Sequence, residues 1–385
     1  MRRRVVLAVL AMTLGLAAPL CLAELILRLL PVRSAMSPPP VDQRDPIRRF
    51  AANQDFTFSE GWNFALVNRG HTNNDGFIND QDYDSTASSP LLAVIGDSFV
   101  EALMLPFRET IEGRLARCVG GSGRVYSFGV SGAPLSQYLV WASYAKARYQ
   151  PVAFTIVIVG NDFDESLLRY KRAPGFHYFR DDSTGLTLQR IDYAPGLARS
   201  LARHSALARY VMLNVSGGAF MGTRLKAMLT GQRLAAQENV GNTAARYSPE
   251  RLESSRRALD RFLLDLPSRA GVEPHHIALV IDGMRPALYS AAGLDAAGGS
   301  FFDVMRRRLM TEADSLGYEV IDMQARFARR YATDGEPFEF PTDDHWNGRG
   351  HEEAARAVAS SRIFQRVFPT ACTSLVPEDE RVARP

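Results

Sequence analysis

The stretch Leu91-Leu92-Ala93-Val94-Ile95-Gly96-Asp97-Ser98 decides the fold of this chain. Its first five residues are apolar, which is typical of a short strand buried on both faces, and the strand ends in Gly-Asp-Ser. Such a strand delivers the Ser98 hydroxyl to the rim of a parallel sheet. Far downstream, Asp343-Asp344-His345 supplies carboxylates and an imidazole that we expect to meet the serine from a single loop. A serine becomes a good nucleophile when a base takes its proton and a third group orients that base, so these residues predict a serine hydrolase or acyltransferase.

From Leu91 onward, apolar strand patterns alternate with helical patterns. Short apolar runs predict strands over 91–96, Arg124–Val130, Ala153–Val159, Ile277–Ile281 and Tyr318–Ile321. Helices are expected near 106–117, 134–148, 249–266 and 301–315. Ser248 and Pro249 supply an N-cap and a proline at the first helical position of the third of these helices. Strands buried on both faces and alternating with helices predict an α/β fold, a three-layer α/β/α sandwich around a mostly parallel five-stranded sheet.

The N-terminus has the composition of a membrane segment. Arg2-Arg3-Arg4 precedes an uncharged apolar stretch, Val5 through Ala23, which is long enough to cross a bilayer as a helix. The arginines favour a cytoplasmic N-terminus. A cleaved signal peptide with a site at Cys21-Leu22-Ala23 remains an alternative, but the apolar pattern continues past Glu24 and favours an uncleaved signal anchor. Either way, the rest of the chain is expected outside the cytoplasm, which for a bacterial protein means a single pass through the inner membrane and a catalytic domain in the periplasm or outside the cell.

The composition divides the chain into four predicted parts. They are a signal anchor or transmembrane helix at 1–30, a proline-rich linker and irregular prelude at 31–86, a catalytic domain at 87–370, and a C-terminal tail at 371–385. Residues 166 to 247 interrupt the catalytic domain, and they are too many for an ordinary connection between a strand and a helix. They contain a predicted hairpin (Phe176–Phe179, Gly185–Tyr193) and an amphipathic run (Leu197–Leu213). Two interpretations stay open, a structural elaboration and a lid beside the active site.

Charge and cysteine usage exclude some partners and leave one question open. The formal net charge is only +3, and no block of lysine and arginine is interleaved with aromatic residues, so nucleic-acid binding has little support. Cys21 lies in the membrane segment, whereas Cys118 and Cys372 lie in the exported part. An oxidising compartment permits these two to form a disulfide, but the sequence does not show the geometry that a disulfide needs. Pairing and two separate half-buried cysteines remain equal alternatives.

With these pieces in place, the chain resembles the GDSL/SGNH hydrolase superfamily, as a membrane-anchored bacterial cell-envelope member with a flavodoxin-like sheet. Gly96-Asp97-Ser98-Phe99 is similar to the first block of that family, which carries the nucleophile. Ser127-Phe128-Gly129-Val130-Ser131-Gly132 is similar to the second block, and Gly160-Asn161-Asp162 to the third. The resemblance implies that the N–H groups of Ser98 and Gly132 and the side-chain amide of Asn161 form the oxyanion hole. The last block, Asp343-Asp344-His345, supplies the base and its orienting acid, and the blocks occur in family order over roughly residues 88 to 366.

The chain departs from the family pattern in its last and second blocks. The usual block has the acid three residues before the histidine, but Thr342 occupies that position, so Asp343 is the predicted acid and Asp344 the alternative. Ser127 stands where asparagine is frequent, which affects packing more than chemistry. The Gly-x-Ser-x-Gly elbow of α/β-hydrolases is absent around Ser98, which disfavours that fold.

The same acidic and histidine residues raise the question of a metal site. Asp343, Asp344, His345 and His351 are chemically suitable ligands, but no His-x-x-x-His or cysteine pair supports such a site. We therefore expect no metal and no cofactor, and we expect His351 to cap or pack the helix that begins near Gly350.

The predicted activity is that of a serine esterase with a triad of Ser98, His345 and Asp343. The resemblance and the exported location imply O-acyl esters as substrates, chiefly O-acetyl esters of envelope glycans. An O-acetyltransferase that moves acetyl to an exported polysaccharide is the alternative, although the acetyltransferases of the alginate type place Asp-x-His before the serine. A non-catalytic envelope scaffold is a third interpretation, which the presence of all three catalytic residue types disfavours.

Overall fold

The computed structural model describes residues 2–182, 185–196, 200, 202–215, 239–372 and 375. The chain forms two compact units. Unit 1 contains residues Met1–Ser37, Asp55–Gly70 and Pro195–Ala235, and unit 2 contains Pro38–Gln54, His71–Ala194 and Ala236–Pro385. The predicted limits of the linker, the catalytic domain and the tail remain predictions. The 166–247 segment is divided between the two units.

Unit 2 is built on a five-stranded sheet in the order β11-β10-β5-β3-β4, and all four strand pairs are parallel. The strands are β3 (Leu91–Gly96), β4 (Arg124–Gly129), β5 (Ala153–Ile158), β10 (Ile277–Ile281) and β11 (Glu319–Asp322). Each lies within one residue of its predicted bounds. The α/β fold class with a five-stranded parallel sheet is thus confirmed.

The strand order has a functional consequence. Numbered along the chain, the five strands have the order 2-1-3-4-5, so the direction in which the sheet grows reverses between β3 and β5. Parallel α/β sheets of this kind bind ligands outside the carboxyl ends of the strands at such a reversal. Ser98 follows β3 and Asn161 follows β5, so the two predicted site residues flank this position.

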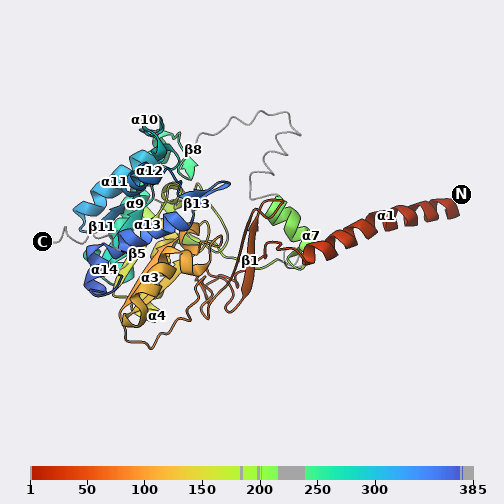
Figure 1. The fold of residues 1–385 in the computed structure, drawn as a ribbon, viewed down its shortest axis with the longest axis horizontal. Helices are drawn as coiled ribbons and strands as arrows, with labels where there is room; N and C mark the ends of the chain where they lie inside the picture. Colours follow the sequence, from red (N-terminus) through yellow and green to blue (C-terminus); the bar gives the residue numbers. More distant parts are fainter. Residues whose placement is uncertain are drawn as a thin grey trace. The chain divides into compact units, whose positions relative to one another are not determined.

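Helices cover both faces of the sheet (Figure 1). One layer contains α3 (Ile111–Val119), α12 (Met323–Asp334), α13 (Gly348–Ala359) and α14 (Arg362–Val367). The other contains α4 (Leu135–Tyr149), α9 (Pro249–Ala270) and α11 (Phe301–Ser315). The predicted helix at 106–117 is a 3-10 turn, η1 (Phe107–Glu109), followed by α3, which begins with Thr110 as its N-cap. The three-layer prediction is correct.

Alternating strand residues build the two halves of the core. In β3, Leu92 and Val94 join the apolar cluster formed with α3, α12, α13 and α14, whereas Ala93 and Ile95 point to the other face. All six residues of the strand are buried, which explains why its sequence is uniformly apolar rather than alternating. The core therefore holds the Gly96-Asp97-Ser98 turn from both sides.

Shorter elements connect these layers. They are α2 (Ser98–Glu101), η2 (Gly120–Ser122), α5 (Asp162–Glu165), β6 (His177–Asp182), β7 (Gly185–Arg190), β8 (Asn239–Val240), β9 (Thr243–Ala244), η4 (Pro274–His276), η5 (Ala287–Tyr289), α10 (Ala291–Ala297), β12 (Glu339–Phe340) and β13 (Asp343–Trp346). Strands β6 and β7 pair antiparallel and form the predicted hairpin.

A residue of the prelude before β3 forms hydrogen bonds with the backbone of the edge strand β4. The Tyr83 hydroxyl accepts a hydrogen bond from Ser127 N at 2.9 Å and donates one to Ser127 O at 2.6 Å. The Ser127 hydroxyl accepts from Asn79 at 3.1 Å. A side chain thus occupies backbone groups that an edge strand would otherwise expose. Ser127, where the family often has asparagine, has a packing role, as expected.

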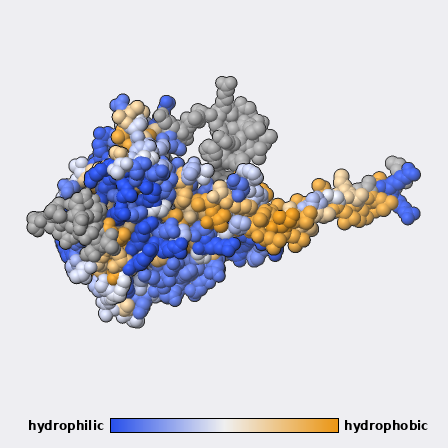
Figure 2. Space-filling model, in the orientation of Figure 1, coloured by the Kyte–Doolittle hydropathy of each residue, from blue (hydrophilic) through white to orange (hydrophobic). Residues whose placement is uncertain are grey.

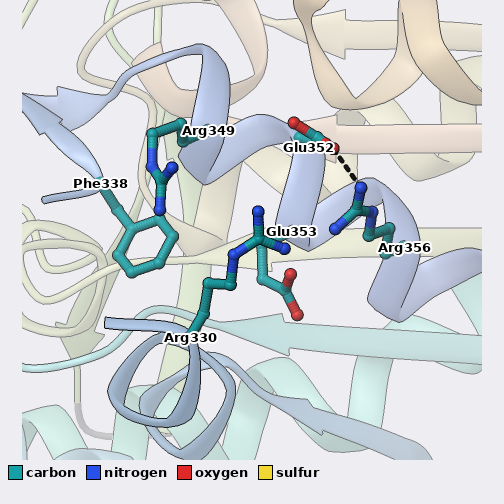
Figure 3. Close-up of a pocket in the computed structure, with 6 residues that line it drawn as sticks. All are labelled: Arg330, Phe338, Arg349, Glu352, Glu353 and Arg356. Atoms are coloured by element: carbon teal, nitrogen blue, oxygen red, sulfur yellow. Dashed lines mark hydrogen bonds and ion pairs between the residues drawn. The ribbon is translucent and has the colours of Figure 1, made fainter. Parts of the chain in front are cut away.

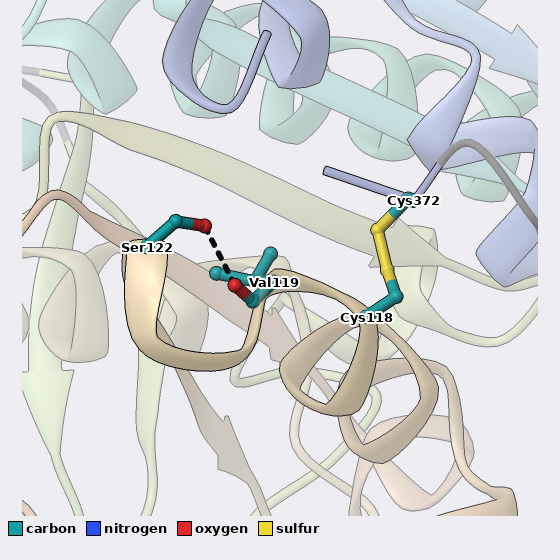
Figure 4. The surroundings of a disulfide bond; sticks show 4 residues. All are labelled: Cys118, Val119, Ser122 and Cys372. Carbon is teal, nitrogen blue, oxygen red and sulfur yellow. Dashed lines mark hydrogen bonds between the residues drawn. A yellow bond between two sulfur atoms is a disulfide. The ribbon is translucent and has the colours of Figure 1, made fainter. Parts of the chain in front are cut away.

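Cys118 and Cys372 form a disulfide that joins α3 to the segment after α14 (Figure 4). The bond closes a loop of 254 residues in sequence separation. Of the two alternatives that the sequence left open, pairing is the correct one. Cys21 is a free cysteine.

Unit 1 contains α1 (Arg2–Arg28), the hairpin strand β1 (Asp55–Glu60) with all but the last residue of its partner β2 (Leu66–His71), α7 (Ala206–Arg209) and a π-helical turn η3 (Tyr210–Val215). Apolar side chains are exposed along α1, as Figure 2 shows. Among the described residues, α1 is the one helix with the length and apolar composition of a membrane span, and a signal sequence has the same properties. Part of the predicted run Leu197–Leu213 lies outside the described residues, and its described part contains α7 and most of η3.

Candidate active site

The turn after β3 fixes Ser98 through local contacts. The Asp97 carboxylate caps α2 by accepting the Phe99 N–H at 2.9 Å, so Ser98 becomes the first residue of that short helix. Gly96 has no room for a side chain, because a Cβ there would lie 2.5 Å from Cγ2 of Val100. The Gly-Asp-Ser sequence is therefore what the backbone needs in order to turn sharply and present the Ser98 hydroxyl.

His345 and Asp343 lie inside strand β13, which pairs with β12 in a small antiparallel hairpin. The prediction of a loop was wrong in this respect. Side chains two residues apart in a strand point to the same side, so Asp343 faces the His345 ring, whereas Asp344 is exposed. The strand geometry explains the unusual Asp-x-His spacing, because in a strand the residue two positions before the histidine is the one beside it.

Ser98, His345 and Asp343 form one hydrogen-bonded row. The Ser98 Oγ lies 2.7 Å from Nε2 of His345, and Nδ1 of His345 contacts Oδ1 of Asp343. The Asp343 carboxylate also accepts the backbone N–H of His345 at 2.9 Å. With its Nδ1 proton donated to Asp343, the neutral imidazole presents the Nε2 lone pair to the serine hydroxyl. The structure thus brings together the three residues that the sequence singled out.

The surroundings raise the pKa of His345. Burial by itself lowers this pKa, but the hydrogen bond and charge of Asp343, with a contribution from the Asp97 charge, outweigh it, and the net shift is upward. Phe99 covers the ring, with 4.9 Å between the ring centroids. A raised pKa makes the imidazole that faces Ser98 more basic.

The hairpin that carries His345 is attached to the end of β10 through a buried arginine. Arg285 binds Asp282 at 2.7 Å and Glu339 of β12 at 3.1 Å, and the Trp346 indole donates to Asp282 at 2.8 Å. Arg285 and Asp282 are both almost completely buried. Each charge in this cluster therefore depends on its partners.

The two other predicted oxyanion donors follow the strands that flank β3. Gly129 of β4 pairs with Gly96 of β3, and Gly132 follows in a turn with φ of +78°, a conformation that favours glycine. Asn161 follows β5, which pairs with β3 on the other side, and it is the N-cap residue of α5. Ser98, Gly132 and Asn161 therefore stand at the carboxyl ends of three adjacent strands.

Several residues near the site were missed at the level of sequence. Lys171 lies against Gly132, and its ammonium group pairs with Glu165. Asn242 is hydrogen-bonded to both the backbone and the side chain of Asn161. No sequence pattern predicted these contacts, because both Lys171 and Asn242 come from the irregular 166–247 segment. Asp282 had a detectable signal, since it directly follows the predicted strand Ile277–Ile281.

His351 has a structural position in α13. It is buried, and its Nδ1 accepts the Ile111 N–H at 3.1 Å, so it helps to cap α3. Burial, with the charge of Arg114, lowers the pKa of His351 to about 3. Within the described part of the chain, no three His, Cys, Asp or Glu side chains converge in a way that could hold a metal ion.

Two pockets lie away from these residues. The pocket in Figure 3 lies between α12 and α13 and is lined by Arg330, Phe338, Arg349, Glu352, Glu353 and Arg356. Its charged groups are paired with one another or with neighbours; for example, Arg356 binds Glu352, and Arg349 binds Asp334. A second pocket, in unit 1, is lined by residues of α1 and α7 and by His204 and Ser205. The predicted catalytic and oxyanion residues line neither pocket.

No protein-family model and no curated protein matches the chain. Solved structures do. The chain is similar to a hydrolase named LAE5 from the metagenome of Lake Arreo, with 14% identity, a TM-score of 0.38 and coverage of 72% of this chain and 96% of that one. It is similar to a lipase/acylhydrolase from Enterococcus faecalis, with 11% identity, a TM-score of 0.37 and coverage of 74% and 97%. It is also similar to a member of the lipolytic G-D-S-L family from Veillonella parvula, with 10% identity, a TM-score of 0.34 and coverage of 71% and 98%.

Proposed function

We propose that this protein is a serine ester hydrolase of the GDSL/SGNH type, in which Ser98 is the nucleophile, His345 the base and Asp343 the orienting acid. One observation carries the proposal, the 2.7 Å contact between the Ser98 hydroxyl and Nε2 of an imidazole whose other nitrogen is held by a carboxylate. Three residue types from two ends of the domain meet in the order that acyl transfer requires.

The reaction proceeds through an acyl-enzyme. His345 Nε2 takes the hydroxyl proton as Ser98 Oγ attacks the ester carbonyl, and the negative oxygen is bound by the N–H groups of Ser98 and Gly132 and the amide of Asn161. The imidazolium then gives its proton to the leaving alcohol as the C–O bond breaks. Water, activated by the same imidazole, attacks the acyl-enzyme, releases the carboxylic acid and restores Ser98.

The substrate class follows from location. The α1 helix is a candidate membrane anchor, and the arginines before it favour a cytoplasmic N-terminus, so the catalytic domain faces the periplasm or the exterior. Esters that occur there include the O-acyl groups of envelope glycans, and O-acetyl groups are the smallest of them. We therefore propose O-acetylated envelope carbohydrate as the substrate.

The test uses the full-length protein in detergent with p-nitrophenyl acetate, beside Ser98→Ala. Release of nitrophenol by the wild type and its loss in Ser98→Ala, with unchanged thermal unfolding, would support the serine mechanism. Equal rates in the two proteins would overturn it. Acetylated and acetyl-free envelope oligosaccharides then test the substrate. Acetate release from the first supports a deacetylase, whereas transfer of labelled acetyl to the second would replace hydrolysis by the acetyltransferase alternative.

A further inference from the structure

The side chain of Asn161 is held by Asn242, which belongs to the 166–247 segment, and by Glu165. Its Nδ2 donates to Oε2 of Glu165 at 2.9 Å, and its Oδ1 accepts a hydrogen bond from Nδ2 of Asn242. The backbone N–H of Asn161 donates to Oδ1 of Asn242 at 3.2 Å. The two asparagines therefore bind each other through a pair of hydrogen bonds.

This pair determines which way the Asn161 amide points. A side-chain amide has an acceptor oxygen and a nitrogen with two N–H groups, and a half-turn about the last bond exchanges them. Because Asn242 occupies the oxygen, the nitrogen is held on the side of Glu165. One of its N–H groups binds Glu165, and the other has no partner within the described residues, which leaves it for a substrate oxygen.

Asn242 is itself firmly placed. It lies in the turn between β8 and β9, next to Gly241, whose φ is +61°. Gly160 leaves room for it, since a Cβ at Gly160 would lie 2.9 Å from the Asn242 Oδ1. Arg251 fastens the same turn to α5 by binding Thr243 at 2.9 Å and Asp164 at 2.9 Å.

Lys171 balances the charge of Glu165. The Lys171 ammonium group pairs with the same Oε2 atom that accepts from Asn161. The Lys171 Nζ is also the atom nearest to where a Cβ of Gly132 would lie, at 3.3 Å. A carboxylate next to the oxyanion donors would oppose the negative charge that develops there, and the ammonium group offsets this effect.

We propose that Asn242 and Lys171 are positioning residues for the oxyanion hole: Asn242 fixes the donor orientation of the Asn161 amide, and Lys171 neutralises Glu165 beside it. The inference rests on the proposed function, because it concerns the site at which Ser98 attacks an ester. It also gives the 166–247 segment a role, which is to complete the active site.

Asn242→Asp tests the orientation. The new carboxylate has no N–H for the Asn161 oxygen and favours a half-turn of that amide. With p-nitrophenyl acetate, kcat is expected to fall by about 10- to 100-fold with KM changed less than about threefold, which is less than the roughly 10²- to 10³-fold cost of removing an oxyanion donor because the Asn161 amide is turned and not removed. Asn239→Asp makes the same chemical change at an exposed residue of the same β8–β9 turn region and should keep the wild-type kcat.

A double-mutant cycle with Asn161→Ala separates positioning from a general structural role. If Asn242 acts through Asn161, adding Asn242→Asp to Asn161→Ala should lower kcat by less than about threefold more. A full 10- to 100-fold further loss, or wild-type kcat in the Asn242→Asp single variant, would overturn the inference for Asn242.

Lys171→Met tests the charge. We expect kcat to fall about 10-fold, and we expect the double variant Lys171→Met/Glu165→Gln to recover most of the loss, because the uncompensated carboxylate is then gone. Lys146→Met, the same substitution in α4, is the control. A Lys171→Met variant with wild-type kcat, or one that Glu165→Gln does not rescue, contradicts this part.

The two levels of proposal fail differently. If Ser98→Ala hydrolyses the ester as fast as the wild type does, the proposed function fails. If Ser98→Ala and Asn161→Ala are impaired but Asn242→Asp and Lys171→Met are not, the hydrolase proposal stands and only the positioning inference fails.

Discussion

The Ser98 turn and the β12–β13 hairpin meet at one hydrogen bond, but they are held in different ways. Ser98 is fixed by its own neighbours in sequence, namely Gly96 and the Asp97 cap, on a strand in the middle of the sheet. His345 lies on a two-stranded hairpin outside that sheet, and the hairpin is attached through the buried Arg285 and Asp282 and the half-buried Glu339. The comparison teaches that the position of the proposed nucleophile depends on local backbone geometry, whereas that of the proposed base depends on long-range charge pairing.

Asp343→Asn should have the largest effect, because it removes the partner that orients the imidazole. The kcat for p-nitrophenyl acetate is expected to fall by about 10²- to 10⁴-fold without loss of stability. Asp344→Asn, the same change at the exposed neighbour, should keep activity within about twofold. Equal loss in both variants would contradict the assignment of Asp343.

The pH dependence of kcat/KM tests the same assignment of Asp343. Ser98 loses its proton only to a neutral imidazole, so kcat/KM should fall as the pH drops below the pKa of His345. Because Asp343 raises that pKa, the wild-type midpoint should lie above 6.5. In Asp343→Asn, burial remains and lowers the pKa, so the midpoint of the residual activity should move to lower pH. A midpoint that stays in place would show that Asp343 does not set the basicity of His345.

Arg285→Met should break the attachment of the hairpin. It leaves the buried Asp282 and the half-buried Glu339 without their cation, which is expected to cost about 3–5 kcal/mol of unfolding free energy and most of the activity. Denaturant unfolding and ester hydrolysis measure the two effects. Arg362→Met removes an exposed arginine that pairs with Glu319 at 3.7 Å and should change stability by less than about 1 kcal/mol. A stable, active Arg285→Met protein would mean that the hairpin is held by something else.

Loss of the disulfide should lower the free energy of unfolding and leave the activity of the Ser98–His345 site unchanged. The Cys118→Ser/Cys372→Ser variant is expected to lose about 2–4 kcal/mol, because a closed loop restricts the unfolded chain. Its kcat at 25 °C should match the wild type, since neither cysteine contacts Ser98 or His345 in the structure. A reduced kcat in a protein that is still folded would show that the disulfide helps to hold the active-site residues in place.

Gly96→Ala should disturb the Ser98 turn alone and have the smallest effect of these variants. The added Cβ meets Val100 at 2.5 Å and Val157 at 3.3 Å, and such overpacking typically costs about 1–3 kcal/mol. We expect a moderate loss of kcat, partly restored by Val100→Ala, which makes room. Gly121→Ala, where nothing lies within 4 Å, is the control. Full activity in Gly96→Ala would show that the Ser98 turn tolerates movement.

The sheet and most of its helices could be predicted because each strand was a short apolar run with its own boundaries. Ile277–Ile281 was correct to the residue, and helix α11 began at its expected position, after the N-cap Ser300. The hairpin β12–β13 could not be predicted, since Glu339-Phe340 is too short to leave a periodic pattern. The contacts of Asn242 and Lys171 could not be predicted either, because the 166–247 segment that carries both residues has no regular pattern.

The sequence by itself determined the order of strands and helices along the chain, the Gly-Asp-Ser turn, and the candidate residues Ser98 and His345 with Asp343 or Asp344 as the acid. These depend on local periodicity and on residue chemistry, which are written along the chain. Only the tertiary structure decided that Cys118 pairs with Cys372, that Asp343 rather than Asp344 faces the imidazole, and that Asn242 and Lys171 surround Asn161. Each of these depends on which residues the folded core brings within a few ångströms of one another. A sequence pattern does not contain such distances.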